Sequence, residues 1–320
     1  MKLSIVIPLY NEAPNLNNLL TNLRRELVMH KYEVILVDDG STDNTIAQVK
    51  ALHYNHFKVL VLNRNYGQTT AMKAGIDAAQ GEYIVTMDGD MQNDPSDIPL
   101  LLNKVQLENW DVVAGYRLHR QDALLYRKLP SRIANSLIRF STGIKLRDYG
   151  CSLKIFKASV AKNLELYGEL HRFIPVLAHI QGAKITEIPV RHHPRTRGRS
   201  KYGISRVLKV ASDLLLMLFF LKYWAKAMHL FGSAGILTFL AGSGMLFYLL
   251  IVKLLGADVG DRPLLNLGVL MILAGIQFVF FGFIAEMLLR LKYKSKNTTP
   301  YHIKEVYEAP ECKQVADFLA

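Results

Sequence analysis

Residues 3–39 read LSIVIPLYNEAPNLNNLLTNLRRELVMHKYEVILVDD, and two short apolar runs flank a helical pattern in this stretch. The runs at 3–10 and 32–39 are rich in Val and Ile and end in polar residues, as strands do. Between them, over 15–27, leucines recur at helical spacing. A strand, a helix and a second strand in this order form a βαβ unit with parallel strands. The stretch therefore predicts an α/β fold.

The same alternation continues along the chain. Further strands are predicted at 57–64, 82–90 and 110–117, and further helices at 44–53, 68–80 and 98–109. This order indicates a mainly parallel, twisted sheet that is covered by helices. The chain has no GxGxxG after its first strand and no P-loop glycine-lysine motif. These absences argue against a dinucleotide dehydrogenase and a P-loop enzyme.

Polar residues follow several of the predicted strands. In a parallel sheet, ligands bind beyond the carboxyl ends of the strands, so these residues are candidates for a binding site. They are Tyr10, Asn11 and Glu12 after the first strand, Asp38 and Asp39 after the second, Asp88 and Asp90 after the fourth, and Arg117 after the fifth. Acidic residues at three strand ends on one edge are difficult to explain by turn formation alone.

The fourth strand runs into TMDGDMQNDP at 86–95. Asp88 and Asp90 can place two carboxylates on one side of a turn, and Gly89 lets the backbone pass close to a ligand. Hard oxygen ligands of this kind suit Mg²⁺ or Mn²⁺. Asp-x-Asp alone also fits an ordinary turn, but the neighbouring acidic strand ends favour the metal. Asp94, before Pro95, is expected only to turn the chain into the next helix.

Two uncharged apolar segments lie near the C-terminus, at 230–252 and 264–285. Each is long enough to cross a membrane as a helix of about 30 Å. Lys and Arg residues flank the pair on its outer sides, while the short connection carries only Lys253 and Arg262. The positive-inside rule then places both termini and the catalytic part in the cytoplasm. No signal peptide is expected, because the N-terminus enters a strand pattern directly.

The net charge of +12 indicates attraction to anionic lipid or phosphate, and no nucleic-acid-binding motif is present. Residues 119–143 are basic and include Arg127, and 191–209 carries seven Lys or Arg and no acid. A charge run is often a solvated face, but this one directly precedes 204–218, which has apolar residues on one helical stripe. That pattern fits a helix in the membrane interface, or one facing a core.

Several further residues have open interpretations. The two cysteines, Cys151 and Cys312, fit a reducing compartment, and Cys151 is interpreted as a packing residue. His171, His192 and His193 have no zinc-binding spacing, so a structural or interfacial role is favoured. Asp148 either caps a loop or helps to place an acceptor.

At this point the sequence resembles a known family. The stretches IVIPLYNE, VDDGSTDNT, NRNYGQTTAMKAGIDAAQGEYIVTMDGDMQNDP, VVAGYR and RGRSKYG look like the inverting family 2 glycosyltransferases with a GT-A fold. Together with the two C-terminal spans, RGRSKYG resembles the polyprenyl-phosphate glycosyltransferases, the group of dolichyl-phosphate mannose synthase and the bactoprenol glucosyltransferases. The resemblance reaches to about Arg290, and the tail from Ser295 resembles no known element.

The resemblance implies a role for each matching position. Nucleotide-sugar binding falls to Pro8, Tyr10, Glu12, Asp38, Asp39 and Asp88; the metal to Asp88, Asp90 and Gln92; catalysis to Asp90, Arg117, Arg199 and Lys201; and the acceptor phosphate to Arg127, Arg195, Arg197 and Lys201. Mg²⁺ or Mn²⁺ is the implied cofactor. A bound metal with Arg or Lys would stabilise the leaving diphosphate, and an ionised acceptor phosphate needs little help from a general base.

The implied organisation is a cytoplasmic GT-A domain at 1–202, an amphipathic helix at 203–228, two membrane helices at 229–290 and a cytoplasmic tail at 291–320. The expected reaction is transfer of a hexose, with UDP-glucose as the first expectation, to a polyprenyl phosphate at the bacterial inner membrane. GDP-mannose or another UDP-sugar is an alternative donor. A growing polysaccharide is a rival acceptor, although no QxxRW occurs, and a non-catalytic membrane scaffold is the rival of another class. Small residues in the spans would allow homo-oligomers.

Overall fold

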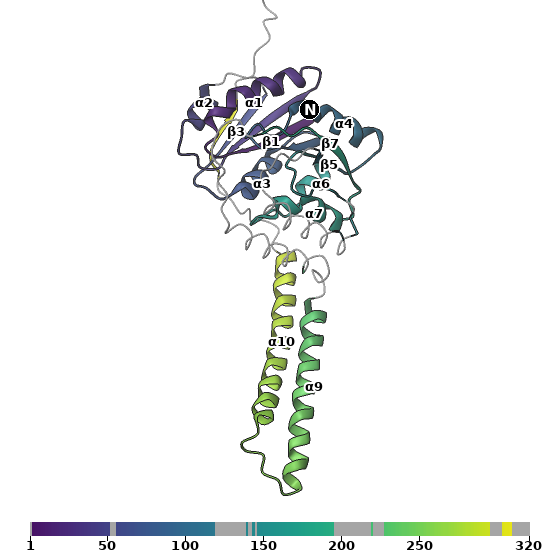
Figure 1. Ribbon diagram of the computed structural model, residues 1–320. Coiled ribbons are helices and arrows are strands. Elements are labelled where there is room, and N and C mark those ends of the chain that lie inside the picture. Colours follow the sequence, from purple (N-terminus) through teal and green to yellow (C-terminus); the bar gives the residue numbers. More distant parts are fainter. Residues whose placement is uncertain are drawn as a thin grey trace, which may run out of the picture. The chain divides into compact units, whose positions relative to one another are not determined.

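The computed structural model describes residues 2–51, 56–118, 139, 143–144, 146–194, 219, 227–294 and 303–308 (Figure 1). Contacts between residues divide the chain into two compact units. The first unit comprises Met1–Leu215 and Thr299–Ala320, and the second comprises Leu216–Thr298. The first unit contains the sheet, and the second contains a pair of long helices.

The described part of the first unit is built on an eight-stranded sheet with the order β7-β5-β6-β4-β1-β2-β3-β8. Its strands are β1 (Leu3–Leu9), β2 (Tyr32–Asp38), β3 (Phe57–Leu62), β4 (Tyr83–Thr86), β5 (Val112–Arg117), β6 (Lys154–Lys157), β7 (Ile185–Val190) and β8 (Ile303–Glu308). β6 is antiparallel to β4 and β5, and β8 is antiparallel to β3. The other pairs are parallel, which confirms the predicted mainly parallel sheet.

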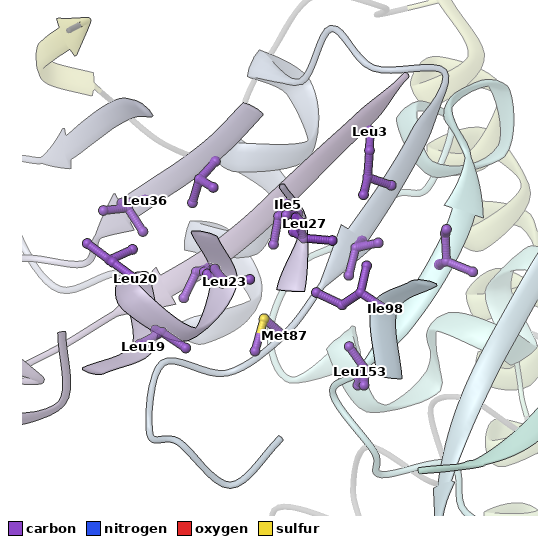
Figure 2. Close-up of a cluster of buried hydrophobic side chains, with 14 of the residues drawn as sticks. Leu3, Ile5, Leu19, Leu20, Leu23, Leu27, Leu36, Met87, Ile98 and Leu153 are labelled. Atoms are coloured by element: carbon purple, nitrogen blue, oxygen red, sulfur yellow. The ribbon is translucent and has the colours of Figure 1, made fainter. Parts of the chain in front are cut away.

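Helices cover both faces of this sheet. They are α1 (Ala13–Glu26), α2 (Thr45–Ala51), α3 (Gln68–Ala78), α4 (Ile98–Leu107), α6 (Ala158–Lys162) and α7 (Ile174–Ile180), with short 3₁₀ helices η1 (Pro95–Asp97) and η2 (Leu170–Phe173). One buried cluster joins the strands to α1 and α4, and the other joins them to α3, α6 and α7. Figure 2 shows the first cluster, where Leu19, Leu20 and Leu23 of α1 lie beside strand residues.

The two clusters explain why the strands carry apolar residues at successive positions. In β1, Ile5 and Ile7 belong to the α1 side and Val6 belongs to the α3 side, and all three are fully buried. Successive side chains of a strand point to opposite faces, so a strand that is covered on both faces is mostly apolar and not alternating. This requirement made the first strands recognisable in the sequence.

The second unit is a pair of helices, α9 (Ala227–Leu254) and α10 (Pro263–Lys294). Both are long and apolar enough to cross a membrane, and only 17% of the most apolar window of each is buried. A core helix of a soluble domain would be mostly buried, so this exposure fits an apolar surrounding. The helices contain both predicted apolar segments and extend beyond them.

Three strands were not predicted from the sequence. β6 has only four residues, and β7 is a strand at the sheet edge that contains Pro189. β8 belongs to the segment that was expected to be a tail, and it adds to the free edge of β3. The predicted amphipathic helix at 203–228 falls almost entirely outside the described residues.

Candidate active site

The carboxyl ends of β1, β2 and β4 lie next to one another, because these strands are parallel neighbours. In register, Leu9 pairs with Asp38, and the Asp39 N–H donates to the Leu9 carbonyl at 2.8 Å. On the other side of β1, the Met87 N–H donates to the Val6 carbonyl at 3.2 Å. The residues that follow the three strands are therefore brought to one edge of the sheet, as predicted.

The loop after β1 is tied to the loop after β2. Asn11 has a left-handed φ of 53°, and its side-chain oxygen accepts from the Thr42 N–H at 2.8 Å. Its own N–H donates to the Ser41 hydroxyl at 2.9 Å, and the Glu12 N–H donates to the Thr45 hydroxyl at 3.0 Å. Tyr10 and Glu12 are partly buried beside this network. Pro8 pairs with Val37 near the end of β1, one position before the Leu9–Asp38 pair.

Asp38 and Asp39 are both buried, and burial raises the pKa of each carboxyl above its ordinary value. Asp39 accepts the Tyr66 N–H at 2.7 Å and the Gly67 N–H at 2.9 Å, one on each oxygen. One oxygen of Asp38 accepts the Ser41 N–H at 3.0 Å, while Oδ1 is buried without a hydrogen-bond partner in the described structure. Asp39 thus supports the turn that starts α3.

The DGD sequence lies at the end of β4. Asp88 is partly buried and accepts a hydrogen bond from the Gln68 side chain at 2.6 Å, and Asp90 is buried. Burial, and then the negative charge of Asp90, raise the pKa of Asp88 to about 6. A Cβ on Gly89 would lie 2.6 Å from a methyl carbon of the buried Leu9 side chain, so a larger residue here would force that side chain to move.

The backbone turns sharply after Asp90. Met91 has a φ of 63°, a left-handed conformation that costs a residue with a side chain roughly 1–3 kcal/mol. The Gln92 N–H then donates to Asp90 Oδ1 at 3.1 Å. This turn sets the position of Gln92 relative to Asp90. Two residues on, Asp94 accepts the Ser96 N–H at 3.0 Å and caps η1, which confirms its predicted role as the start of the next helix.

Arg117 ends β5 and is held by Asp148. Its Nε and Nη2 donate to the two oxygens of Asp148 at 2.6 and 3.0 Å, and both side chains are largely buried. Asp148 also accepts the Gly150 N–H at 3.1 Å, so it caps its loop as one interpretation of the sequence expected. The two-point contact fixes the plane of the guanidinium. This partnership could not be predicted from the sequence, because the two residues come from separate segments.

A buried lysine, Lys154, lies near Asp88 of the DGD sequence. Lys154 of β6 is 2% exposed, and its ammonium donates to the Cys151 carbonyl. Burial lowers the pKa of Lys154, and its charge in turn favours ionised Asp88. Burial also raises the pKa of the Cys151 thiol to about 11, which agrees with a packing residue and not a nucleophile. Lys154 and Gln68 are polar neighbours of the site that sequence reasoning missed.

The residues present fit a divalent cation. Within the described residues, no group of three or more His, Cys, Asp or Glu side chains is placed to hold a metal. The Asp88 and Asp90 carboxylates nevertheless repel each other at the end of one strand, and a cation would relieve that repulsion. Mg²⁺ and similar ions often take only one or two protein carboxylates and complete their shell with phosphate oxygens and water.

Five of the predicted site residues lie outside the described residues: Arg127, Arg195, Arg197, Arg199 and Lys201. The described range 146–194 ends just before the last four of these. The structure therefore brings together the donor-side residues of the prediction, and the basic residues stay a prediction.

Solved structures share this fold. Glucosyl-3-phosphoglycerate synthase from Mycobacterium tuberculosis, bound to phosphoglyceric acid, matches with a TM-score of 0.55 at 16% identity, over 69% of this chain and 79% of that one. Residues 1–349 of TarS from S. aureus, bound to UDP-GlcNAc, match with a TM-score of 0.51 at 17% identity, over 68% of this chain and 67% of that one. The fold is that of the GT-A glycosyltransferases.

Sequence comparison narrows this class. The family model "Glycosyl transferase family 2" matches residues 4–165. Dodecaprenyl-phosphate galacturonate synthase of Rhizobium johnstonii is 42% identical over 96% of this chain and 94% of its own length. Undecaprenyl-phosphate 4-deoxy-4-formamido-L-arabinose transferase of Shewanella sediminis is 35% identical over 98% of this chain and 96% of its own length. The chain belongs to glycosyltransferase family 2, as the resemblance implied. Neither of these two relatives is named for glucose.

Proposed function

We propose that this enzyme transfers a sugar from a UDP-sugar to the phosphate of a polyprenol. The observation that carries the proposal is the acidic edge formed by Asp38, Asp39, Asp88 and Asp90 in a chain whose full length matches two lipid-phosphate sugar transferases. UDP is proposed as the carrier because a solved neighbour binds UDP-GlcNAc. A scaffold without turnover has no comparable support.

The proposed sugar is a uronic acid, galacturonate, in place of the glucose first expected. The Rhizobium relative that is 42% identical over nearly the whole chain is named for galacturonate. A second candidate is 4-deoxy-4-formamido-L-arabinose, for which the 35% identical relatives are named. Neither observation favours glucose or mannose.

The donor is proposed to lie along the acidic edge. Pro8, Tyr10 and Glu12 would contact the base and ribose, with Asp38 behind them. Asp39 uses both oxygens on the Tyr66–Gly67 backbone, so we assign it to shaping this wall. Asp88 and Asp90, with Gln92 beside them, would hold Mg²⁺ or Mn²⁺. When bound, such an ion neutralises charge on the diphosphate, and a solved neighbour contains Mn²⁺ together with UDP-glucose.

The reaction is proposed as a single displacement with inversion. An oxygen of the lipid phosphate forms a bond to the anomeric carbon while the bond from that carbon to the diphosphate breaks, so UDP leaves with the electron pair. Arg117, whose guanidinium is held by Asp148, is proposed to stabilise a phosphate oxygen. The basic residues Arg127, Arg195, Arg197, Arg199 and Lys201 are proposed to contact the phosphates of donor and acceptor.

The helices α9 and α10 are proposed to cross a bacterial inner membrane, with the sheet in the cytoplasm. The exposure of their apolar side chains supports this placement. The basic flanks, with Lys222 and Lys226 before α9, support the orientation. An enzyme fixed in this way would work where the lipid headgroup emerges from the bilayer. The same helices could support a homo-oligomer.

The test uses full-length protein in detergent with Mn²⁺, undecaprenyl phosphate and one UDP-sugar at a time, and product is detected by mass spectrometry. UDP-galacturonate is expected to give the highest rate. The other donors tested are UDP-4-deoxy-4-formamido-L-arabinose and UDP-glucose. Asp90→Asn should lower the rate by at least about 100-fold. The matched control is Asp77→Asn on α3, where the carboxylate pairs with Lys73.

The outcomes separate the parts of the proposal. If no UDP-sugar yields a lipid-linked product, transfer to polyprenyl phosphate is wrong. A faster reaction with UDP-glucose than with UDP-galacturonate would remove the uronate assignment alone. Full activity of Asp90→Asn, with the same metal requirement as Asp77→Asn, would remove the metal assignment.

A further inference from the structure

The loop that follows the DGD sequence is fastened to the chain that follows β7. Asn93 forms an isolated antiparallel bridge with His192, and the His193 N–H donates to the Gln92 carbonyl at 2.9 Å. The two segments are about a hundred residues apart in the sequence, so this contact is not a local turn. We name the contact between 92–97 and 191–193 the loop clasp.

Side-chain contacts close the clasp, and the Arg191 guanidinium contributes one of them by donating to the Ser96 hydroxyl at 3.2 Å. Asp97 is 2% exposed and accepts the Arg191 backbone N–H at 2.7 Å. The His193 ring nitrogen Nε2 lies 3.0 Å from Asp94 Oδ2. Removing one partner of this hydrogen bond would leave a buried polar group unsatisfied, which costs free energy. The Asp97–Arg191 contact therefore stabilises the clasp, and the His193–Asp94 contact beside it is partly exposed.

The other end of the loop is fixed as well. The Asn93 side chain donates to the Ser152 hydroxyl at 2.6 Å, and Asn93 is almost fully buried. Ser152 also forms a hydrogen bond with Asp88. The loop is consequently held between β6 and the end of β7, and the residue that starts it is Met91, whose φ is left-handed.

A left-handed residue with a side chain persists only when its surroundings hold it. Met91 also packs against the buried cluster on the α1 side, and we expect that without the clasp this packing would not keep it left-handed, so that Gln92 would move away from Asp90. We propose that the loop clasp is a positioning device for the donor site, because it holds Met91 left-handed and thereby fixes Gln92 beside Asp90. This proposal rests on the proposed function, in which Asp88, Asp90 and Gln92 hold the metal and donor diphosphate.

The clasp is weakened with the double variant Asp97→Ala/His193→Ala, which removes the Asp97 contact with the Arg191 N–H and the His193 contact with Asp94. Its matched control is Asp97→Asn/His193→Gln, which keeps an oxygen acceptor and an N–H donor at the same two positions. A second control, Lys104→Ala, removes an exposed ion pair on α4 whose atoms are 2.7 Å apart. His193→Ala alone serves if the double variant does not fold, because that side chain is half exposed.

The measurement is the dissociation constant of UDP in the presence of Mn²⁺, by calorimetry on the full-length protein. Loss of the clasp should weaken this binding by roughly tenfold, a typical effect of removing a residue that orients a metal ligand. The Asp97→Asn/His193→Gln and Lys104→Ala proteins should stay within about twofold of the unaltered protein, since the contacts that hold the loop are kept.

A suppressor distinguishes positioning from general stability. Asparagine adopts left-handed φ more readily than methionine does. Adding Met91→Asn to Asp97→Ala/His193→Ala should therefore recover most of the lost affinity, leaving less than about a threefold deficit, although it restores no contact of the clasp. A merely structural clasp predicts a lower unfolding temperature, unchanged affinity and no rescue, and that result would overturn the proposal.

The result can be separated from the proposed function. If the unaltered protein binds UDP with Mn²⁺ but transfers no sugar, the acceptor assignment fails while the clasp is still tested by the affinities. If it transfers sugar and the clasp variant keeps full affinity, the clasp fails alone. Absence of Mn²⁺-dependent UDP binding in the unaltered protein would overturn both.

Discussion

The Arg117 guanidinium depends on a single carboxylate for its two-point contact. The Asp148 side chain is 12% exposed and that of Arg117 is 15% exposed. Removing one member of a largely buried pair leaves a charge that has lost its partner. We expect Asp148→Ala to lower the free energy of unfolding by about 3 kcal/mol and to slow sugar transfer. Denaturant unfolding of the detergent-solubilised protein measures the first effect.

The comparison for Asp148→Ala is an exposed ion pair of similar chemistry. Arg25 Nε and Glu26 Oε1 lie 2.8 Å apart, but the Arg25 side chain is 73% exposed. Glu26→Ala should cost less than about 1 kcal/mol, because solvent screens such pairs. Equal losses for the two variants would show that Asp148 is not the support of Arg117.

At the scale of elements, α9 and α10 pack through glycines. A Cβ on Gly275 would lie 2.7 Å from the Gly235 carbonyl oxygen, whereas a Cβ on Gly244 would meet nothing within 4 Å. Gly275→Leu should therefore force the helices apart and cost about 1–3 kcal/mol, as overpacking does. Gly244→Leu, on the same pair of helices, should cost much less.

The measurement for these glycines is unfolding by SDS at a constant concentration of dodecyl maltoside, followed by far-UV circular dichroism. Gly275→Leu should unfold at a lower SDS fraction than the unaltered protein, and Gly244→Leu should match it. A larger shift for Gly244→Leu would mean that the two helices pack through other faces.

Elements also show how far the sequence could lead. β1 to β5 were predictable because each is mostly apolar and is followed by polar residues. β6 was not predictable, because it contains Lys154. This lysine is buried near other ionisable groups, and the spacing of residues in the sequence does not reveal that burial. The carboxylates at the strand ends could be placed because parallel strands bring them to one edge. The Arg117 partnership with Asp148 and the loop clasp depend on segments that meet only in the folded chain.

At the scale of the whole molecule, β8 constrains the membrane topology that we propose for α9 and α10. It follows α10 in the sequence, yet it pairs with β3 in the same sheet as the N-terminal strands. If α9 and α10 both span a membrane, a chain that leaves this sheet before α9 and rejoins it after α10 should have both outer ends of the helix pair in the compartment that contains the sheet. If both helices span, the connection at 255–262 must lie on the opposite side.

This topology is tested by labelling intact cells with a maleimide that cannot cross membranes. Gly260→Cys, in the exposed connection, should react, because the chain crosses the bilayer once before it and once after it. The native Cys312, four residues beyond β8, should react only after the membrane is permeabilised, since β8 ties it to the side of the sheet. Cys151 gives no background, because it is 1% exposed and its thiol pKa is about 11. Labelling of Cys312 in intact cells would contradict the arrangement, because a strand cannot pair with β3 from across a bilayer.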